Sequence, residues 1–239
     1  MNGLLIQPTP QDPLTVWRRN TSQTIVSSFQ NVPRDQFGGQ VYNRSNSTIG
    51  NLSTPVGFNA VAYGNRSTAI GGFANAREDS SIAIGIYARA FATSALAIGD
   101  QSHASAYRSI AIGTTALASG IRSISIGTIA RASSQNAIAI GINASASASD
   151  AIAIGNSVSA TATTAISIGF GSSATGIESI QIGAGTNSGS NAIGIGDGAA
   201  ISAANAIGIG AGAVVNAASG IMIGHGGTDG IVSGARGIL

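Results

Sequence analysis

The chain has 239 residues, of which 34 are glycine, 5% are aromatic and 8% are charged, and this composition excludes an ordinary enzyme core rich in large side chains. All eleven basic residues are arginine, and the net charge of +2 is too small to indicate a nucleic-acid partner. The absence of cysteine excludes disulfide frameworks and thiolate metal sites.

Residues 1–50 are rich in polar side chains and are interrupted by Pro8, Pro10, Pro13 and Pro33. They contain no basic stretch followed by an apolar one, as a secretory signal would, and no apolar run long enough for a membrane-spanning helix. A segment of this composition cannot bury enough apolar surface to build its own core. We therefore predict an extended N-terminal arm over residues 1–50, without membrane insertion.

Residues 51–224 form an array of repeats that each close on a glycine, as in the Ala-Ile-Ala-Ile-Gly unit at 137–141. The spacing is fourteen residues throughout, except for a single interval of thirteen before Gly196. The glycines are Gly57, Gly71, Gly85, Gly99, Gly113, Gly127, Gly141, Gly155, Gly169, Gly183, Gly196, Gly210 and Gly224. Such a period indicates a solenoid.

Two alternating patterns fill each period. A large–small–large pattern precedes the glycine, and small residues recur three and five positions after it, as at Ala144 and Ala146. Alternation with a spacing of two is typical of β-strands and places both large residues on one face. Each period is therefore predicted to hold two short strands and two turns, with a core stack of isoleucines that includes Ile138, Ile140, Ile152 and Ile154.

Fourteen residues are too few for a coil of a helical solenoid, which needs roughly 33 to 47, but they suit one coil of a parallel β-roll. Coils stacked about 4.8 Å apart give a shaft of roughly 55 to 60 Å. Tight turns commonly need positive φ, which glycine adopts at little cost. The predicted turn glycines are Gly85, Gly99, Gly113, Gly127, Gly141, Gly155, Gly169 and Gly183.

Two isoleucines and two alanines per coil make a thin core, and we expect the alanine strand to leave an apolar face toward water. Self-association would cover such a face. A closed symmetric oligomer is the simplest arrangement that does so, because a repeat array extends the same interface along its whole length.

The units SIAIGIYARA, AIAIGINASA and AIAIGNSVSA resemble the fourteen-residue head repeat of the YadA-like trimeric autotransporter adhesins. This resemblance covers about residues 51 to 224. It implies an all-β fold, a left-handed parallel β-roll that assembles as a homotrimer. It also implies a function, which is to hold an adhesive surface away from a cell.

The chain shows no signal peptide, heptad stalk or membrane anchor, which such adhesins carry, and so it also resembles a bacteriophage head or tail fibre that has acquired the adhesin roll. This interpretation predicts a virion protein whose arm docks on other virion structural proteins through Trp17, Arg18 and Arg19. A second interpretation of Trp17 is that it caps the first coil. The predicted boundaries are residues 1–50 for the arm, 51–224 for the shaft and 225–239 for a C-terminal tip that contacts a host cell-surface glycan or protein.

Two other interpretations of the shaft stay open. The chain fits the head-domain portion of a bacterial adhesin on the cell surface, and it also fits a purely structural capsid or tail decoration. An ice-binding solenoid is disfavoured because threonines such as Thr161 and Thr163 do not persist from coil to coil.

Charged and aromatic residues gather in the first half of the shaft. Residues 57–131 hold six arginines and three acids, 6 − 3 = +3, whereas residues 132–224 hold three acids and no arginine, −3. Arg66, Arg108 and Arg122 each lie nine residues after a repeat glycine, which predicts a shared edge. The aromatic residues of this half predict either a surface-contacting belt or packing against a protomer or the arm; they are Phe58, Tyr63, Phe73, Tyr87, Phe91 and Tyr107.

No set of residues predicts catalysis, a cofactor or a metal site. Gly194–Gly198 and Gly208–Gly212 resemble dinucleotide loops only because the repeat generates them. His103 and His225 are isolated in the sequence, which is typical of solvated histidines. The chain is therefore predicted to be non-enzymatic.

Overall fold

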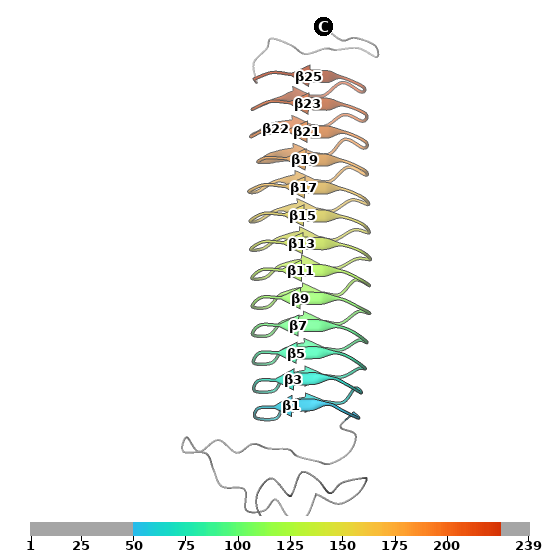
Figure 1. Ribbon diagram of the computed structural model, residues 1–239. Coiled ribbons are helices and arrows are strands. Elements are labelled where there is room, and N and C mark those ends of the chain that lie inside the picture. The colour runs from blue at the N-terminus through green and yellow to red at the C-terminus, as the bar shows by residue number, and fades with distance from the viewer. Residues whose placement is uncertain (1–49, 226–239) are drawn as a thin grey trace, which may run out of the picture. The chain divides into compact units, whose positions relative to one another are not determined.

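The computed structural model describes residues 50–225, which form one elongated parallel β-roll (Figure 1). Every coil gives one strand to each of two sheets, so that neighbours within a sheet are always successive coils. Within residues 50–225 there is no helix with the length and apolarity needed to traverse a lipid bilayer. The predicted all-β parallel solenoid is confirmed.

The first sheet has 13 strands, one for each repeat glycine, and each strand is three residues long. These strands are β1 (Thr54–Val56), β3 (Thr68–Ile70), β5 (Ile82–Ile84), β7 (Leu96–Ile98), β9 (Ile110–Ile112), β11 (Ile124–Ile126), β13 (Ile138–Ile140), β15 (Ile152–Ile154), β17 (Ile166–Ile168), β19 (Ile180–Ile182), β21 (Ile193–Ile195), β23 (Ile207–Ile209) and β25 (Ile221–Ile223).

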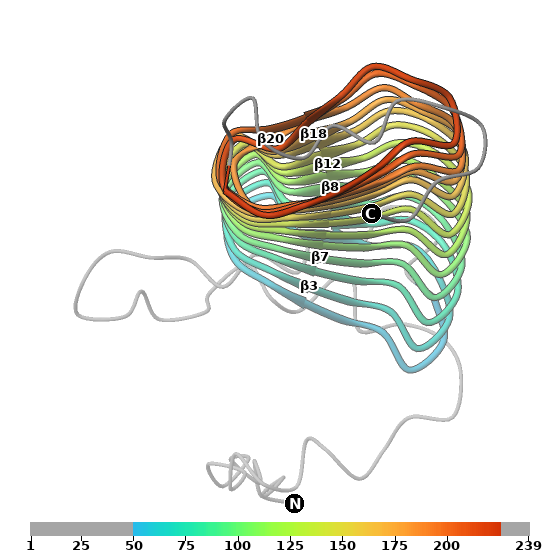
Figure 2. The same ribbon diagram turned by 90° about the horizontal axis from the view of Figure 1, so that it is seen from above.

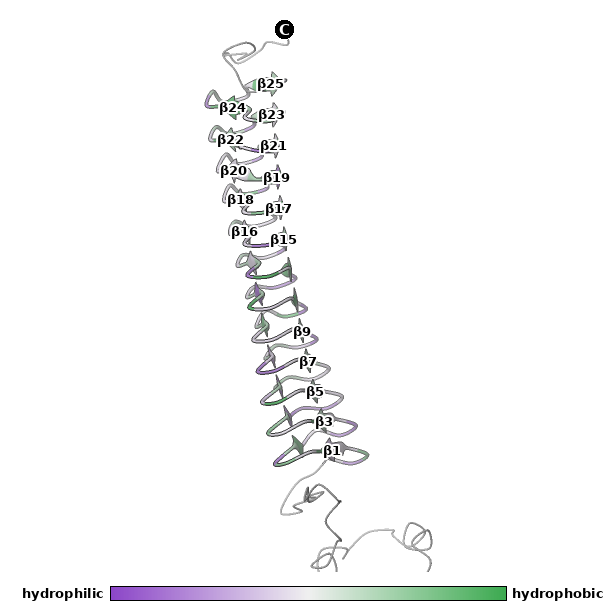
Figure 3. Cartoon of the chain, turned by 90° about the vertical axis from the view of Figure 1, so that its left-hand side faces the viewer, coloured by the Kyte–Doolittle hydropathy of each residue, from purple (hydrophilic) through white to green (hydrophobic). Residues whose placement is uncertain are grey.

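The second sheet has 12 strands, which run beside the first sheet as a separate column (Figure 3). These strands are β2 (Val61–Ala62), β4 (Asn75–Ala76), β6 (Arg89–Ala90), β8 (His103–Ala104), β10 (Leu117–Ala118), β12 (Arg131–Ala132), β14 (Ser145–Ala146), β16 (Ser159–Ala160), β18 (Ser173–Ala174), β20 (Gly185–Asn187), β22 (Ala199–Ile201) and β24 (Val214–Val215).

The register of both sheets follows the repeat. In the first sheet Ile138 pairs with Ile152 and Ile140 with Ile154, and in the second sheet Ser145 pairs with Ser159. Every residue therefore lies above its equivalent in the coil before, and the coils superpose when the roll is seen from above (Figure 2). The predicted isoleucine stack exists, with its hydrogen bonds running along the roll.

The interior of the roll is lined by small side chains from both sheets. Ala139 of the first sheet and Ala144 and Ala146 of the second coil wall have at most 1% of their surface exposed. The isoleucines at 138 and 140 are only half-buried, because they point to the opposite face of the same strand. The prediction that the isoleucines form the core of a single roll is therefore wrong for the protomer: their ladders lie on its outside.

The physical reason is the length of the coil. Fourteen residues, some of them used in turns, enclose a space too narrow for isoleucines from one wall to face side chains from the other. Alanine and serine fit, so the small residues of the alternating pattern turn inward and the large ones turn outward. The alanine-bearing second strand, expected to leave an apolar face toward water, instead packs its alanines inside.

Buried serines replace alanine at several inward positions, and their hydroxyls are paired at some of these positions but not at Ser123, Ser125 and Ser179. The hydroxyl of Ser67 donates to the carbonyl of Gly64 at 2.6 Å, and that of Ser109 donates to the carbonyl of Ala106 at 2.7 Å. Both bonds span three residues, so each serine satisfies a turn carbonyl of its own coil. A hydroxyl is therefore compatible with this interior where a turn lies next to it.

The thirteen-residue interval marks a change in the core. There Asn187 is buried, and its Nδ2 donates to the carbonyls of Ile180 at 2.9 Å and Ala192 at 2.8 Å. In β21 and β23 glycine replaces alanine at the inward position of the first sheet, and Ile201 and Val215 fill the space from the second sheet. The interior volume filled by side chains is therefore conserved, but the second sheet now supplies most of it.

Candidate functional site

The outer face of the first sheet is a continuous apolar surface. From β5 to β25 every strand turns two large aliphatic side chains outward and the residue between them inward, and that residue is small except for Gln181 in β19 and Met222 in β25. Neighbours in the ladder cover part of each side chain, yet Ile154 is 36% exposed and Ile223 is 73% exposed. Soluble monomers rarely expose apolar surface of this extent. Self-association is thus expected through the isoleucine face, and not through the alanine strand.

The turn glycines are required for two separate reasons. All eight that were predicted have φ between +99° and +141°, well beyond the left-handed helical region that other residues tolerate. A Cβ added at Gly99 would also lie 2.6 Å from the carbonyl oxygen of Gly113 in the next coil. The coils therefore stack so closely at this turn that only hydrogen fits.

Two further positions in most coils have positive φ without needing glycine. In the coil that starts at Gly85 they are Tyr87, with φ of 57°, and Ser94, with φ of 59°. These values lie in the left-handed helical region, where other residues pay a modest cost. Sequence reasoning missed both positions because their residue types vary from coil to coil.

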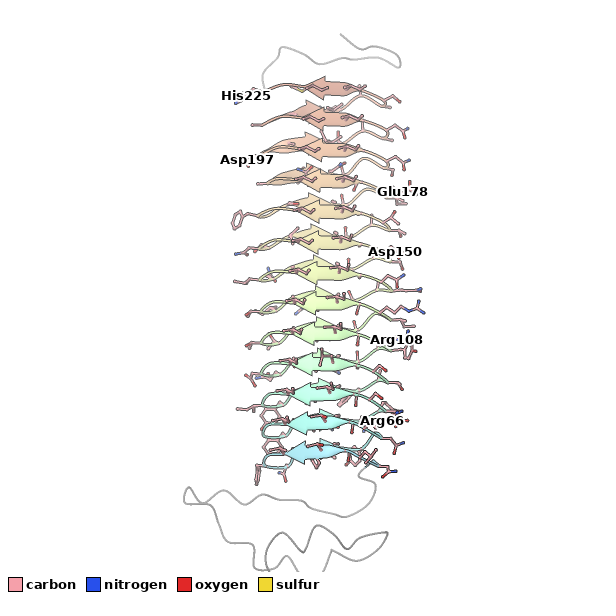
Figure 4. The ribbon with its side chains drawn as sticks, viewed as in Figure 1. Arg66, Arg108, Asp150, Glu178, Asp197 and His225 are labelled. Carbon is pink, nitrogen blue, oxygen red and sulfur yellow. The ribbon has the colours of Figure 1, made fainter. Side chains whose placement is uncertain are left out.

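One of these positions forms an edge of the roll, and it carries the residues nine after each repeat glycine. Arg66 and Arg108 lie on this edge together with Asp150 and Glu178 (Figure 4), so the predicted shared edge of arginines is confirmed and extends into acids. Its side chains make contacts within and between coils: the Arg108 guanidinium lies 4.9 Å from the centre of the ring of the preceding Tyr107, and Asn136 Nδ2 donates to Asp150 Oδ1 of the next coil at 2.8 Å. The edge changes from basic to acidic along the roll.

The aromatic residues of the first coils contact one another. Phe58 and Phe73 pack edge to face with ring centres 5.3 Å apart, and Phe73 stacks on Tyr87 at 4.8 Å with an interplanar angle of 8°. On the other side of the second sheet, the Arg77 guanidinium lies 5.1 Å from the Phe91 ring, which packs edge to face on His103 at 5.2 Å. These side chains form two short ladders that flank strands β4, β6 and β8.

Between these ladders lies a hollow of about 380 Å³, lined by Tyr87, Arg89, Gln101 and His103. Arg89 and His103 face outward from directly paired positions of β6 and β8. Burial of the imidazole, and then the charge of Arg89, lower the pKa of His103 from its ordinary value of 6.5. His103 is therefore neutral at pH 7, with both hydrogen-bond donor and acceptor capacity in its ring.

Sequence reasoning treated His103 as an isolated residue and missed this hollow. The signal was present, because His103 lies fourteen residues after Arg89 and Gln101 lies fourteen after Tyr87. In a roll whose period is fourteen, that spacing alone makes two residues neighbours. The expected surface-contacting belt and the packing of a protomer or arm on these aromatics both stay predictions.

From β14 to β20 the outward residues of the second sheet are small and polar, and in β22 and β24 they are Ala200 and Val214. Ser145, Ser159 and Ser173 occupy the column that Arg89 and His103 occupy near the start. Arg131 is the last arginine of this column and lies between Leu117 and Ser145. The distinctive chemistry of this face is therefore confined to the first coils.

Several predictions concern residues that the structure does not describe. The docking residues Trp17, Arg18 and Arg19 lie outside residues 50–225, as do all of the arm except Gly50 and all of the tip except His225. In the described part of the chain, no three histidine, aspartate or glutamate side chains come close enough together to hold a metal ion.

Comparison with known families identifies the repeat. The model of the YadA head domain repeat matches residues 49–74, 76–102, 90–116, 104–130, 118–141 and 132–157. A search of curated proteins found no match. From residue 76 onward the matched segments begin fourteen residues apart, which is the length of one coil, and so YadA head domain repeats are detected in tandem across residues 49–157 of the roll.

Proposed function

We propose that the chain is a non-enzymatic structural fibre that assembles as a homotrimer and contributes to attachment to a host or another surface. The observation that carries this proposal is the isoleucine face, defined as the outward side chains of β5 to β25 in the first sheet. The YadA head domain repeat supports an adhesin-like structural role for the same coils.

The isoleucine face favours assembly because water is removed from it along the whole roll at once. Burial of apolar surface contributes about 25 cal/mol per Å², and the ladders repeat the same pair of side chains at every coil. Three such faces close around one axis and leave no copy uncovered, which is the property of a cyclic oligomer. The number three comes from the resemblance to YadA-like heads, as does the left hand of the coils.

In such a trimer the outer face of the second sheet stays free for contact. It lies on the opposite wall of the coil from the isoleucine face, and its side chains differ from coil to coil. Each fibre presents every contact three times, and several fibres on one carrier raise the effective concentration further. Weak individual contacts therefore suffice for attachment.

We further propose which particle bears the fibre, a phage virion or a bacterial cell. The arm and shaft favour a phage virion, with residues 1–50 docked on other virion structural proteins and residues 225–239 at the distal tip. The family of the repeat fits a bacterial cell surface equally well. A labelled antibody against the shaft separates the two, because it would decorate intact virions in the first case and intact cells in the second.

The trimer is tested by sedimentation velocity of the full chain, which should give a single species of three times the chain mass over a wide range of concentrations. A soluble, folded monomer would overturn the proposal. Attachment is tested with the same trimers on host cells at low and high salt, with and without residues 225–239. Trimers that bind no surface under any of these conditions would favour the alternative of a structural decoration.

A further inference from the structure

We infer that the hollow lined by Tyr87, Arg89, Gln101 and His103 binds a carboxylate-bearing sugar residue of a surface glycan. This inference rests on the proposed function, because it names the ligand of an attachment fibre. It concerns the outer face of the second sheet, which the trimer leaves accessible.

The four side chains are held in place by the backbone of the roll. Arg89 and His103 are direct neighbours in the parallel pairing of β6 with β8, about 4.8 Å apart. Tyr87 and Gln101 precede them by two residues, at turn positions with φ of 57° and 55°. The backbone N–H of Gln101 donates to the carbonyl of Ile86 at 2.8 Å, and so the two turns are bonded to each other. The backbone therefore fixes the spacing of the four side chains before a ligand binds.

Each side chain supplies one element of sugar recognition. The exposed Arg89 offers a planar guanidinium that pairs with a carboxylate through two hydrogen bonds. Tyr87 is 44% exposed and is held flat against Phe73, so it presents an aromatic face on which the apolar face of a sugar ring can pack. The Gln101 amide donates to and accepts from hydroxyl groups.

His103 supports the same assignment. Its Nε2 is buried and has no hydrogen-bond partner among the described residues. A buried polar atom without a partner costs about 1–3 kcal/mol, and a rotation of the ring toward the hollow would let a ligand hydroxyl satisfy it. The volume of about 380 Å³ lies at the lower end of ligand sites, which suits one sugar residue of a longer glycan.

The same features disfavour a nucleic acid at this site. Backbone recognition of a nucleic acid needs several cations in a row. Along this column the neighbours of Arg89 and His103 are Asn75 and Leu117, which carry no charge. A single cation beside an aromatic platform instead fits a ligand with a single negative charge and an apolar ring face.

The test measures binding of monosaccharides to the full-length trimer by saturation-transfer NMR and calorimetry. The probes are the methyl glycoside of N-acetylneuraminic acid, glucuronic acid, neutral N-acetylglucosamine and inorganic phosphate. We expect one of the acidic sugars to bind at least tenfold more tightly than N-acetylglucosamine and phosphate. Preference for the sialic acid would indicate animal-type glycans, and preference for the uronic acid would indicate polysaccharides.

Arg131 supplies the matched control, because it occupies the same outward position on β12 without aromatic neighbours of its own column. Arg89→Gln should lower the affinity at least tenfold, Tyr87→Ala should do the same, and Arg131→Gln should leave it unchanged. Equal losses of affinity in Arg89→Gln and Arg131→Gln would show that binding depends only on the overall charge of the fibre, and would overturn the inference. So would equal binding of neutral and acidic sugars, or no binding at millimolar concentration.

Sedimentation of every variant separates this inference from the proposed function. Trimers that attach to cells but bind none of the sugars would refute the inference and leave the proposed function standing. A wild-type chain that sediments as a folded monomer would refute the proposed trimer itself.

Discussion

The two sheets of the roll share one backbone period and differ in what they show to the outside. The first sheet repeats isoleucine at both outward positions from β5 onward, apart from Leu96. The second sheet turns one residue per strand outward, and that residue ranges from Arg89 and His103 to Leu117 and Ser145. Uniform side chains suit a surface that meets copies of itself, and varied ones suit a surface that meets something else. The proposed self-association and the proposed attachment would thereby use opposite walls of the same coil.

The largest expected effect comes from introducing charged residues into the isoleucine face. Replacing Ile138 and Ile152 together with Asp places two carboxylates on adjacent coils of the isoleucine face, where burial without partners costs several kcal/mol each. We expect the trimer to be lost in sedimentation velocity. The matched control, Ser145→Asp with Ser159→Asp, changes the same two coils on the other sheet and should remain trimeric. If both pairs behave alike, the isoleucine face is not the interface.

A smaller but still large effect is expected at the turn glycines that both walls share. Gly113 has φ of +129°, and a Cβ there would lie 2.5 Å from the carbonyl oxygen of Gly127, so Gly113→Ala adds backbone strain to a clash with the next coil. We expect a loss of about 3 kcal/mol, measured from urea unfolding at one fixed protein concentration.

Gly72→Ala is the control for this substitution. An added Cβ at Gly72 meets nothing within 4 Å, and so its unfolding curve should overlay that of the wild type. A wild-type midpoint for Gly113→Ala would show that the stack relaxes at this turn.

A moderate loss of stability is expected at Gly208, where Ile201 of the second sheet fills the interior next to a glycine of the first sheet. A Cβ at Gly208 would meet Cδ1 of Ile201, so Gly208→Ala should cost about 2 kcal/mol through overpacking. Ile201→Val removes that Cδ1 atom and should by itself cost about 1 kcal/mol. The double variant should be more stable than the sum of the two losses predicts, as a double-mutant cycle in urea would show. Strict additivity would mean that the two residues do not share the space.

The smallest expected effect is a pH dependence of stability that arises from His103 in the second sheet. Because burial and Arg89 lower the pKa of His103 from 6.5, the folded chain binds a proton there less readily than the unfolded chain. Stability should therefore be complete above about pH 6.5 and should fall slightly as the pH drops below it. Melting temperatures at pH 7.5 and pH 5.5 measure the change, and His103→Gln should show a smaller one. An identical change in both proteins would assign it to other groups.

The candidate hollow could be predicted from the sequence only in part. The fourteen-residue spacing of Arg89 and His103, and of Tyr87 and Gln101, makes each pair neighbours once the period is known. The contact between the two pairs depends on how the turn before β6 curves, and residue spacing does not specify this. The buried state of His103 Nε2 likewise follows from the packing of several coils.

The sequence by itself determined the period, the two strands per coil, the parallel register and the turn glycines. These features are local or repeat exactly, so counting residues and noting alternation is sufficient to find them. Only the tertiary structure decided which face of each strand points inward. An alternating strand such as Ile138–Ala139–Ile140 reads equally well with either face buried, and the choice depends on the space that fourteen residues enclose. Because that space admits chiefly alanine and serine, and takes Ile201 and Val215 where glycine stands on the first sheet, the isoleucines of the first sheet lie outside, where we expect a second copy of the chain to cover them.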